Sequence, residues 1–185
     1  MPKAVLDDMK SNMEKTLGVL KNEFLKIRTG RASTSILDSV KVEYYGNSSS
    51  ISQVATLAVP EPRTITISPW EAKIIPAIEK AILNANIGLT PSNDGRTIRL
   101  NLPPLTEERR KEIAKDLKRK AEDDKVALRN IRRDAIDKLK KLEKDKAISE
   151  DELKKFEKDV QDATKSFEQK VDEAVAHKEK EVMEV

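Results

Sequence analysis

The amino-acid sequence predicts an α+β protein in which a small β/α/β domain interrupts an elongated three-helix bundle. The 80 residues from Thr106 to Val185 contain neither glycine nor proline and are rich in Lys, Glu, Asp, Leu and Ala, as long helices are. Residues 31–105, by contrast, hold seven of the eight prolines and only 13 of the 69 charged side chains. We therefore expect two domains, residues 1–30 with 106–185 and residues 31–105.

Three apolar stripes with spacings of three and four residues predict the helices of the bundle. The first stripe comprises Leu6, Met9, Met13, Leu17, Leu20, Phe24 and Ile27, and Gly30 follows it as the expected helix cap. The second comprises Ile113, Leu117, Ala121, Leu128, Ile131, Ala135, Leu139 and Leu142. The third comprises Leu153, Phe156, Val160, Ala163, Phe167, Val171 and Ala174. Between the last two, Ser149 and Glu152 have the spacing of a capping box that starts a helix.

The charge-poor insert shows the two-residue alternation of strands around one short helix. Alternating apolar residues predict strands at 40–44, 55–59, 65–67 and 98–102, with turns at 46–48, 60–62 and 93–95. Pro76 stands in the favoured first position of a helix that runs past Ile82. Trp70 is expected in the core or at the rim of this domain, and one of Tyr44 and Tyr45 should pack while the other is exposed.

Composition and motifs argue against an enzyme. The chain has no cysteine, which excludes disulfides, thiol catalysis and cysteine-bound metals. Neither G-x-x-x-x-G-K-[ST] nor G-x-G-x-x-G occurs, and the single histidine, His177, stands among lysines and glutamates. Apolar runs are too short for a membrane span or a signal peptide. We expect a cytoplasmic protein with no catalytic residues, metal or cofactor.

The charges are divided unequally between the second and third helices. Residues 106–146 carry 16 basic and 11 acidic side chains, whereas residues 147–185 carry 7 and 12. On a helical wheel, seven cations of the second helix fall within an arc of about 100°, beside the apolar stripe. This basic ridge comprises Lys111, Lys115, Lys118, Lys125, Arg129, Arg132 and Arg133.

Two interpretations of the basic ridge remain open at this stage. Guanidinium groups bind phosphate in a bidentate manner, so the ridge could contact a nucleic-acid backbone. Alternatively, it could pair with the acidic third helix or face water. No aromatic residue is interleaved with the ridge, so any RNA would be recognised by its phosphates and shape rather than by its bases.

Five segments of the chain resemble the bacterial ribosome recycling factor family. They are Lys26 to Ser33 (KIRTGRAS), Val42 to Gly46 (VEYYG), Leu102 to Arg110 (LPPLTEERR), Arg129 to Ala135 (RNIRRDA) and Ile148 to Glu152 (ISEDE). The resemblance extends from end to end and matches the usual length of the family. It implies an L-shaped, two-domain protein with a transfer-RNA-like outline, in which a three-helix bundle carries a hinged β/α/β domain.

The resemblance also implies a function. Members of this family bind the post-termination 70S ribosome and, with elongation factor G and its GTP hydrolysis, split it into subunits, which frees mRNA and deacylated tRNA. The alternative is a helical RNA-binding or partner-binding scaffold with no role in splitting. Because the three apolar stripes can pack against one another within one chain, we expect a monomer. Because the apolar runs are short, we also expect no membrane among its partners.

The matching positions define candidate site residues. Arg110, Arg129 and Arg132 are expected to contact 23S ribosomal RNA, with Arg133 beside them. Arg28 and Arg31 are weaker candidates, because an arginine there could equally cap the first helix. The double linker should act as a hinge, formed by Gly30 and Arg31 on one strand and by Pro103, Pro104, Leu105 and Thr106 on the other.

Overall fold

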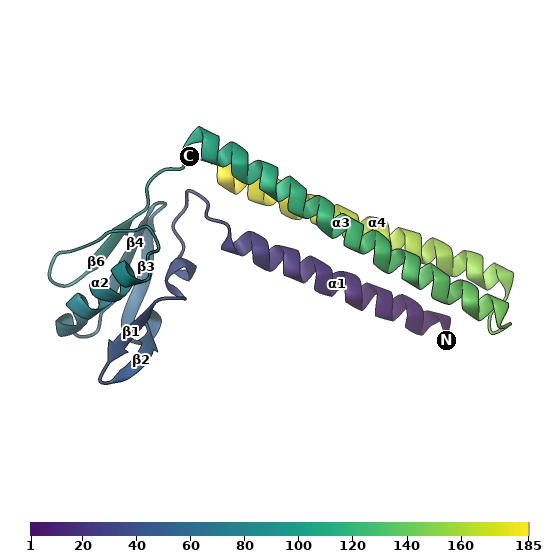
Figure 1. The fold of residues 1–185 in the computed structure, drawn as a ribbon, viewed down its shortest axis with the longest axis horizontal. Helices are drawn as coiled ribbons and strands as arrows, with labels where there is room; N and C mark the ends of the chain where they lie inside the picture. Colours follow the sequence, from purple (N-terminus) through teal and green to yellow (C-terminus); the bar gives the residue numbers. More distant parts are fainter. Residues whose placement is uncertain (185) are drawn as a thin grey trace. The chain divides into compact units, whose positions relative to one another are not determined.

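A computed structural model describes residues 1–184 and separates the chain into two compact units. The first unit contains Met1–Arg28 and Glu107–Met183, and the second contains Thr29–Thr106 together with Glu184. Three long helices form the first unit, and two small sheets with one short α-helix form the second (Figure 1). The predicted α+β class, a helical bundle with an inserted β/α domain, is therefore confirmed.

The helices are α1 (Pro2–Lys26), α2 (Ile75–Asn84), α3 (Glu107–Lys144) and α4 (Glu150–Met183), with short 3₁₀ segments η1 (Thr34–Leu37), η2 (Ile51–Gln53) and η3 (Ala72–Ile74). The strands are β1 (Lys41–Tyr44), β2 (Asn47–Ser50), β3 (Ala55–Glu61), β4 (Thr64–Pro69), β5 (Pro91–Asn93) and β6 (Ile98–Asn101).

The core of the first unit lies along the seam between α1, α3 and α4. All positions of the first predicted stripe are buried except Ile27, which is half-buried. Along α4 burial moves off the predicted stripe in the second half of the helix, where Val175 and Val182 are buried and Ala174 is only half-buried. The buried Thr164 also lies in this seam, and its hydroxyl donates to the Val160 carbonyl at 2.8 Å.

The expected cap of the first helix was wrong. α1 ends at Lys26, and Ile27 already has extended backbone, with φ −73° and ψ 123°. The N–H of Ile27 donates to the Phe24 carbonyl at 3.2 Å, which tightens the last turn without a left-handed residue. Gly30 is not among the glycines with positive φ, so it caps nothing.

The predicted capping box at the start of α4 is confirmed. The backbone N–H of Ser149 donates to Glu152 Oε2 at 2.8 Å, and the N–H of Glu152 donates to Ser149 Oγ at 3.2 Å. These hydrogen bonds from Ser149 lower the pKa of the Glu152 carboxyl. The box fixes where α4 begins and therefore how α3 and α4 are aligned.

The second unit contains two antiparallel sheets, one with strand order β1-β2 and one with order β3-β4-β6-β5. Its core includes Ile65 and Ile67 of β4, Ile98 and Leu100 of β6, and Ile78 of α2. The turn predicted at 60–62 lies later, because β3 continues through Pro60 to Glu61 with a register shift after Ala58. A proline is tolerated there because β3 is an edge strand.

One acidic residue of α3 faces the seam of the bundle. Asp124 is half-buried on the same helical face as Ala121 and Leu128, and its Oδ2 atom has no hydrogen-bond donor among residues 1–184. Burial, together with the nearby Glu23 carboxylate, raises the pKa of Asp124 to about 6. The charged form is therefore disfavoured in the folded chain.

We predict that Asp124→Asn stabilises the bundle at pH 7 by roughly 1–2 kcal/mol, a figure reduced from the full pKa shift because the site is partly exposed. Since the folded pKa lies above the unfolded value, the wild-type chain should lose stability as pH rises from about 4 to 6, and the variant should lose less. Urea unfolding followed by circular dichroism across this range measures the difference. Asp123→Asn, at the exposed neighbouring position, is the control; equal curves for both variants would contradict the prediction.

Candidate nucleic-acid interface

The basic ridge lies on one face of α3. The apolar stripe of the same helix packs against α1 and α4. Arg129, Arg132 and Arg133 fall within about one helical turn, so the structure brings these three predicted site residues together. Arg129 and Arg132 are half-buried at their bases, and Arg133 is exposed. Three guanidinium groups on one turn offer phosphate a dense set of charge-assisted donors.

Part of the ridge pairs with the acidic helix α4, as one of the two interpretations expected. Lys118 Nζ lies 3.3 Å from Glu179 Oε1, and Lys125 Nζ lies 2.6 Å from Asp172 Oδ1. The α4 partner moves back along the chain as the α3 residue moves forward, as antiparallel helices require. These ion pairs link α3 to α4. They also neutralise lysine charges that the sequence alone would assign to an anionic ligand.

Arg129 is held in the same way by two carboxylates. Its Nη1 donates to Glu122 Oε1 at 3.3 Å, and its Nε lies 3.6 Å from Glu168 Oε1 on α4. The remaining N–H groups of the guanidinium are not used by these two contacts, so Arg129 keeps donors for a phosphate. Sequence reasoning missed both acids. The acidic composition of the third helix was the available signal for Glu168, and the seven-residue spacing from Arg129 on the same helix was the available signal for Glu122.

The other part of the ridge has no such partners. Within residues 1–184, Lys115, Arg132 and Arg133 form no ion pair with any carboxylate. Arg132 and Arg133 come directly after the paired Arg129, so the free charge of this turn belongs to these two side chains. An exposed cation without an internal partner is available to an anionic ligand.

The remaining predicted residues do not join this group. Arg110 lies in the first turn of α3 and is half-buried, about 28 Å from Arg129 along the helix axis. Arg28 is exposed just beyond the end of α1. Arg31 is exposed in the second unit, where it forms an ion pair with Glu184.

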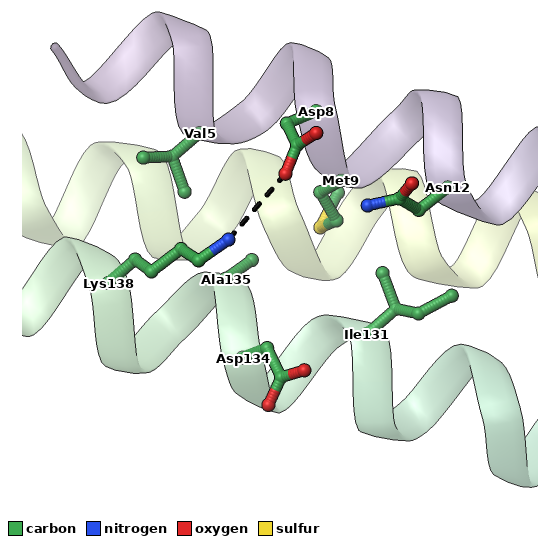
Figure 2. Close-up of a pocket in the computed structure, with 8 residues that line it drawn as sticks. All are labelled: Val5, Asp8, Met9, Asn12, Ile131, Asp134, Ala135 and Lys138. Carbon is green, nitrogen blue, oxygen red and sulfur yellow. Dashed lines mark ion pairs between the residues drawn. The ribbon is translucent and has the colours of Figure 1, made fainter.

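Two hollows occur in the part of the chain that the structure describes. Figure 2 shows a pocket between α1 and α3 in which Lys138 reaches toward Asp8, with their charged atoms 3.6 Å apart, while Asp134 points away. Its volume is about 60 Å³, well below the usual size of a ligand pocket. A second hollow, about 730 Å³, is a shallow groove between β1 and α2.

A polar cluster in the second unit joins the β1–β2 hairpin to η3. Tyr44 donates to Glu71 Oε1 at 2.8 Å, and Lys73 Nζ donates to the Tyr45 hydroxyl at 2.6 Å. The hydrogen bond from Lys73 is the largest cause of the lowered pKa of Glu71. Of the two tyrosines, Tyr44 is half-buried and Tyr45 is exposed. Trp70, expected in the core or at its rim, is 67% exposed and therefore does not lie in the core.

Among the described residues, no group of three or more His, Asp or Glu side chains is arranged to hold a metal ion. His177 is exposed on α4, 3.3 Å from Glu181 Oε1. No helix within residues 1–184 is both long and apolar enough to cross a bilayer.

Together, these features define a two-unit α+β protein whose three-helix bundle carries a row of cations that is only partly paired with carboxylates. Comparison with known proteins is more specific. The family model described as ribosome recycling factor matches residues 20–183. The chain is 77% identical to the ribosome-recycling factor of Pelobacter propionicus and 69% identical to that of Geobacter metallireducens, each over 100% of both chains.

Solved structures agree with this result. The fold is similar to a solution structure of ribosome recycling factor, with a TM-score of 0.75, 38% identity and coverage of 100% of this chain and 98% of that one. It is also similar, with a TM-score of 0.64, 43% identity and full coverage of both chains, to a T. thermophilus ribosome recycling factor described with E. coli elongation factor G bound to the E. coli post-termination complex. The chain belongs to the ribosome recycling factor family, and its function is ribosome recycling in protein biosynthesis.

The division of the ridge into paired and unpaired cations predicts different effects on stability. Lys125→Ala removes a 2.6 Å pair with Asp172 from a side chain that is only 21% exposed, so it should cost about 0.5–1 kcal/mol of unfolding free energy. Arg132→Ala should leave the unfolding free energy within about 0.5 kcal/mol of wild type. Urea titrations test both, and a double-mutant cycle with Asp172→Ala isolates the pair. Equal losses in the two variants would contradict this division.

Proposed function

We propose that this protein binds the post-termination 70S ribosome through its helical bundle and, with elongation factor G and GTP, splits the ribosome into subunits. Splitting releases mRNA and deacylated tRNA for a new round of translation in the cytoplasm. The observation that carries the proposal is the full-length relative, 43% identical, that is described with elongation factor G on a post-termination complex. The chain itself supplies no catalytic step, and the energy comes from GTP hydrolysis by the partner.

The anchoring surface that we propose is the unpaired part of the ridge against 23S ribosomal RNA. Arg132 is the central contact, with Arg133 and Arg129 beside it, because their guanidinium groups can each engage phosphate oxygens. Arg110 would make a separate contact nearer the start of α3. Arg28, just beyond the end of α1, and Arg31, in the proposed linker itself, are secondary candidates.

Recognition through phosphates has a measurable consequence. Each lost phosphate contact to RNA should lower the slope of log affinity against log salt by about 0.7 to 0.9. Because no aromatic residue stands among the ridge cations, replacing one arginine should weaken binding to all RNA sequences alike.

We further propose that the two linker strands form a hinge. Gly30 and Arg31 make one strand, and Pro103 to Thr106 make the other. In this mechanism the bundle stays anchored while elongation factor G pushes the β/α/β domain, so that force reaches the ribosome through the anchored helices. Prolines keep one strand stiff, while glycine lets the other change its backbone angles.

We predict that Arg132→Ala abolishes or strongly slows the loss of light scattering when post-termination 70S ribosomes are mixed with the protein, elongation factor G and GTP. The wild-type reaction should require all three components and should fail with a non-hydrolysable nucleotide. Arg119→Ala is a matched control, because Arg119 is an exposed arginine of the same helix that pairs with Asp116 at 3.4 Å. If a folded wild-type chain causes no loss of scattering in a matched bacterial system, the recycling mechanism is refuted and the scaffold alternative stands.

We predict that Gly30→Ala separates anchoring from splitting. A Cβ atom at Gly30 would meet nothing within 4 Å, so the substitution should not disturb packing, but it restricts the backbone of the proposed hinge. Ribosome affinity should remain within about twofold of wild type, while the splitting rate falls. Gly18→Ala is the control, since that position in α1 is equally open and the substitution should only stabilise the helix, by about 1 kcal/mol. An unchanged splitting rate in Gly30→Ala would argue against a glycine-dependent hinge.

A further inference from the structure

The second unit carries a groove between β1 and α2 whose volume, about 730 Å³, falls within the usual range of ligand sites. One wall consists of β1 and the turn that follows it, and none of the lining residues belongs to β2. The other wall is α2, which presents the short side chains of Ala77, Ala81 and Ala85. This β1–α2 groove therefore follows the edge of β1 that faces away from β2.

The backbone of β1 is unpaired along this edge. β1 joins β2 through a two-residue turn at 45–46, so Tyr44 and Asn47 form the first hydrogen-bonded pair of the hairpin. Pairing alternates along an antiparallel ladder, so the N–H and C=O groups of Lys41 and Glu43 point to the other edge. Within residues 1–184 no strand pairs with that edge. Such an edge can accept an extended peptide as an additional strand.

Three charged side chains at the groove have no partner within the described part of the chain. Lys41 and Glu43 stand two positions apart on β1, and Lys80 stands on the α2 wall. All three are exposed, and none forms an ion pair among residues 1–184. The groove therefore offers positive charge beside Lys41 and Lys80 and negative charge beside Glu43.

The ring of Tyr45 is fixed at the hairpin end of the groove. Its φ of 48° is left-handed, a conformation in which a bulky residue is an outlier and for which such turns usually use Asn, Asp or Gly. Its hydroxyl accepts from Lys73 Nζ at 2.6 Å and donates to Glu71 Oε2 at 3.2 Å. Tyr45 is nevertheless 69% exposed. Backbone strain that holds an exposed aromatic side chain against a groove points to a binding role.

We propose that the β1–α2 groove binds an extended segment of a partner protein, which adds to the free edge of β1 as an antiparallel strand and carries alternating charges. Opposite residues of an antiparallel pair project to the same face, so a basic side chain would stand opposite Glu43. Two positions further on, an acidic side chain would stand opposite Lys41, with Lys80 reinforcing the attraction.

The residue between these two charges completes the recognised pattern. It would stand opposite Val42, which is buried in the same core as Ile78 of α2, and would project to that face. The short side chains of α2 leave room for it there. The partner segment therefore reads basic, apolar, acidic, and the alternating charges of β1 select it over strands without this pattern.

A separate segment fits this edge better than a second copy of the chain does. β1 itself reads Lys-Val-Glu from 41 to 43, so its charges would match an antiparallel copy of itself. Each copy, however, carries α2 along the same edge, so two helices would have to share the space of one added strand. A single extended segment brings no such helix.

The test is fluorescence anisotropy of the full chain with the labelled peptide TKVEVT. The swapped peptide TEVKVT should bind about tenfold more weakly, because two attractive cross-strand pairs become repulsive. Methylation of the backbone nitrogen of the peptide lysine or glutamate should abolish binding, since these N–H groups donate to β1. Methylation of the nitrogen of the valine between them should change affinity by less than about twofold, because that N–H points away from β1.

Variants of the chain make the result specific. The double variant Lys41→Glu with Glu43→Lys should prefer TEVKVT to TKVEVT, a reversal that loss of folding cannot produce. Ala81→Gln should weaken binding of both peptides, because the longer side chain fills the groove. Leu83→Gln, at an exposed position of α2 outside the groove, is the matched control and should leave binding unchanged. Tyr45→Asn keeps a residue that tolerates the turn and should also weaken binding.

Three outcomes would overturn the proposal. The first is that neither peptide binds at concentrations up to about 1 mM. The second is that both bind equally, or that the two kinds of backbone methylation have equal effects, since the edge then reads neither charge nor register. The third is a dimer in sedimentation equilibrium that Lys41→Glu abolishes, because a second copy would then occupy the edge. Ribosome splitting enters none of these measurements, so the proposed function and this proposal fail separately.

Discussion

The narrow apolar seam between α1, α3 and α4 is the constraint on which the rest of this protein depends. Each helix buries only one stripe, so the polar flanks of neighbouring helices are brought side by side along the length of the bundle. Asp8 of α1 then meets Lys138 of α3, and Asp172 of α4 meets Lys125 of α3. The capping box at Ser149 determines where α4 begins and hence which charges of α3 and α4 face each other. The electrostatic character of α3 is therefore a product of packing as well as of composition.

This packing explains why one helix can have two electrostatic halves. Near its start, α3 gives much of its positive charge to carboxylates that hold it against α1 and α4, including Glu23 and Glu179. Beyond Arg129, α4 offers its ridge no further carboxylate partner among the described residues. The cations of α3 thus serve cohesion mainly in its first half and are mostly free in its second half, although Lys115 is unpaired and Lys138 pairs with Asp8. Asp124 is the opposite case, an acid of α3 that faces the seam without a partner. Its charged form is disfavoured there, and its pKa is raised to about 6.

The long helices of this fold can be predicted from the sequence because a helix repeats one local pattern, an apolar residue every three or four positions. Stripe spacing identifies all three long helices, and the spacing of Ser149 and Glu152 identifies the start of α4. It fails where a choice depends on distant residues or on backbone angles. Gly30 looks like a helix cap, but an extended Ile27 ends α1 earlier, and Lys146 takes the left-handed position in which the sequence offers no glycine. The identities of Glu168 and Asp172 as partners of the ridge depend on the alignment of α3 and α4, which no local pattern contains.

Incomplete neutralisation of the ridge suits a factor that must leave the ribosome after each round. At 0.1 M salt each phosphate contact contributes about five- to eightfold to affinity, so contacts from all seven ridge cations would give roughly 10⁵- to 10⁶-fold and contacts from four of them roughly 10³-fold. If the proposed function holds, internal pairing of Lys118, Lys125 and, in part, Arg129 lowers the attainable affinity by about two orders of magnitude, while it links α3 to α4. On the proposed function, the carboxylates of α4 adjust binding toward reversibility without removing the arginines that give it position. A uniformly free ridge would bind more tightly and release more slowly, because differences in affinity between related complexes lie mostly in the rate of dissociation.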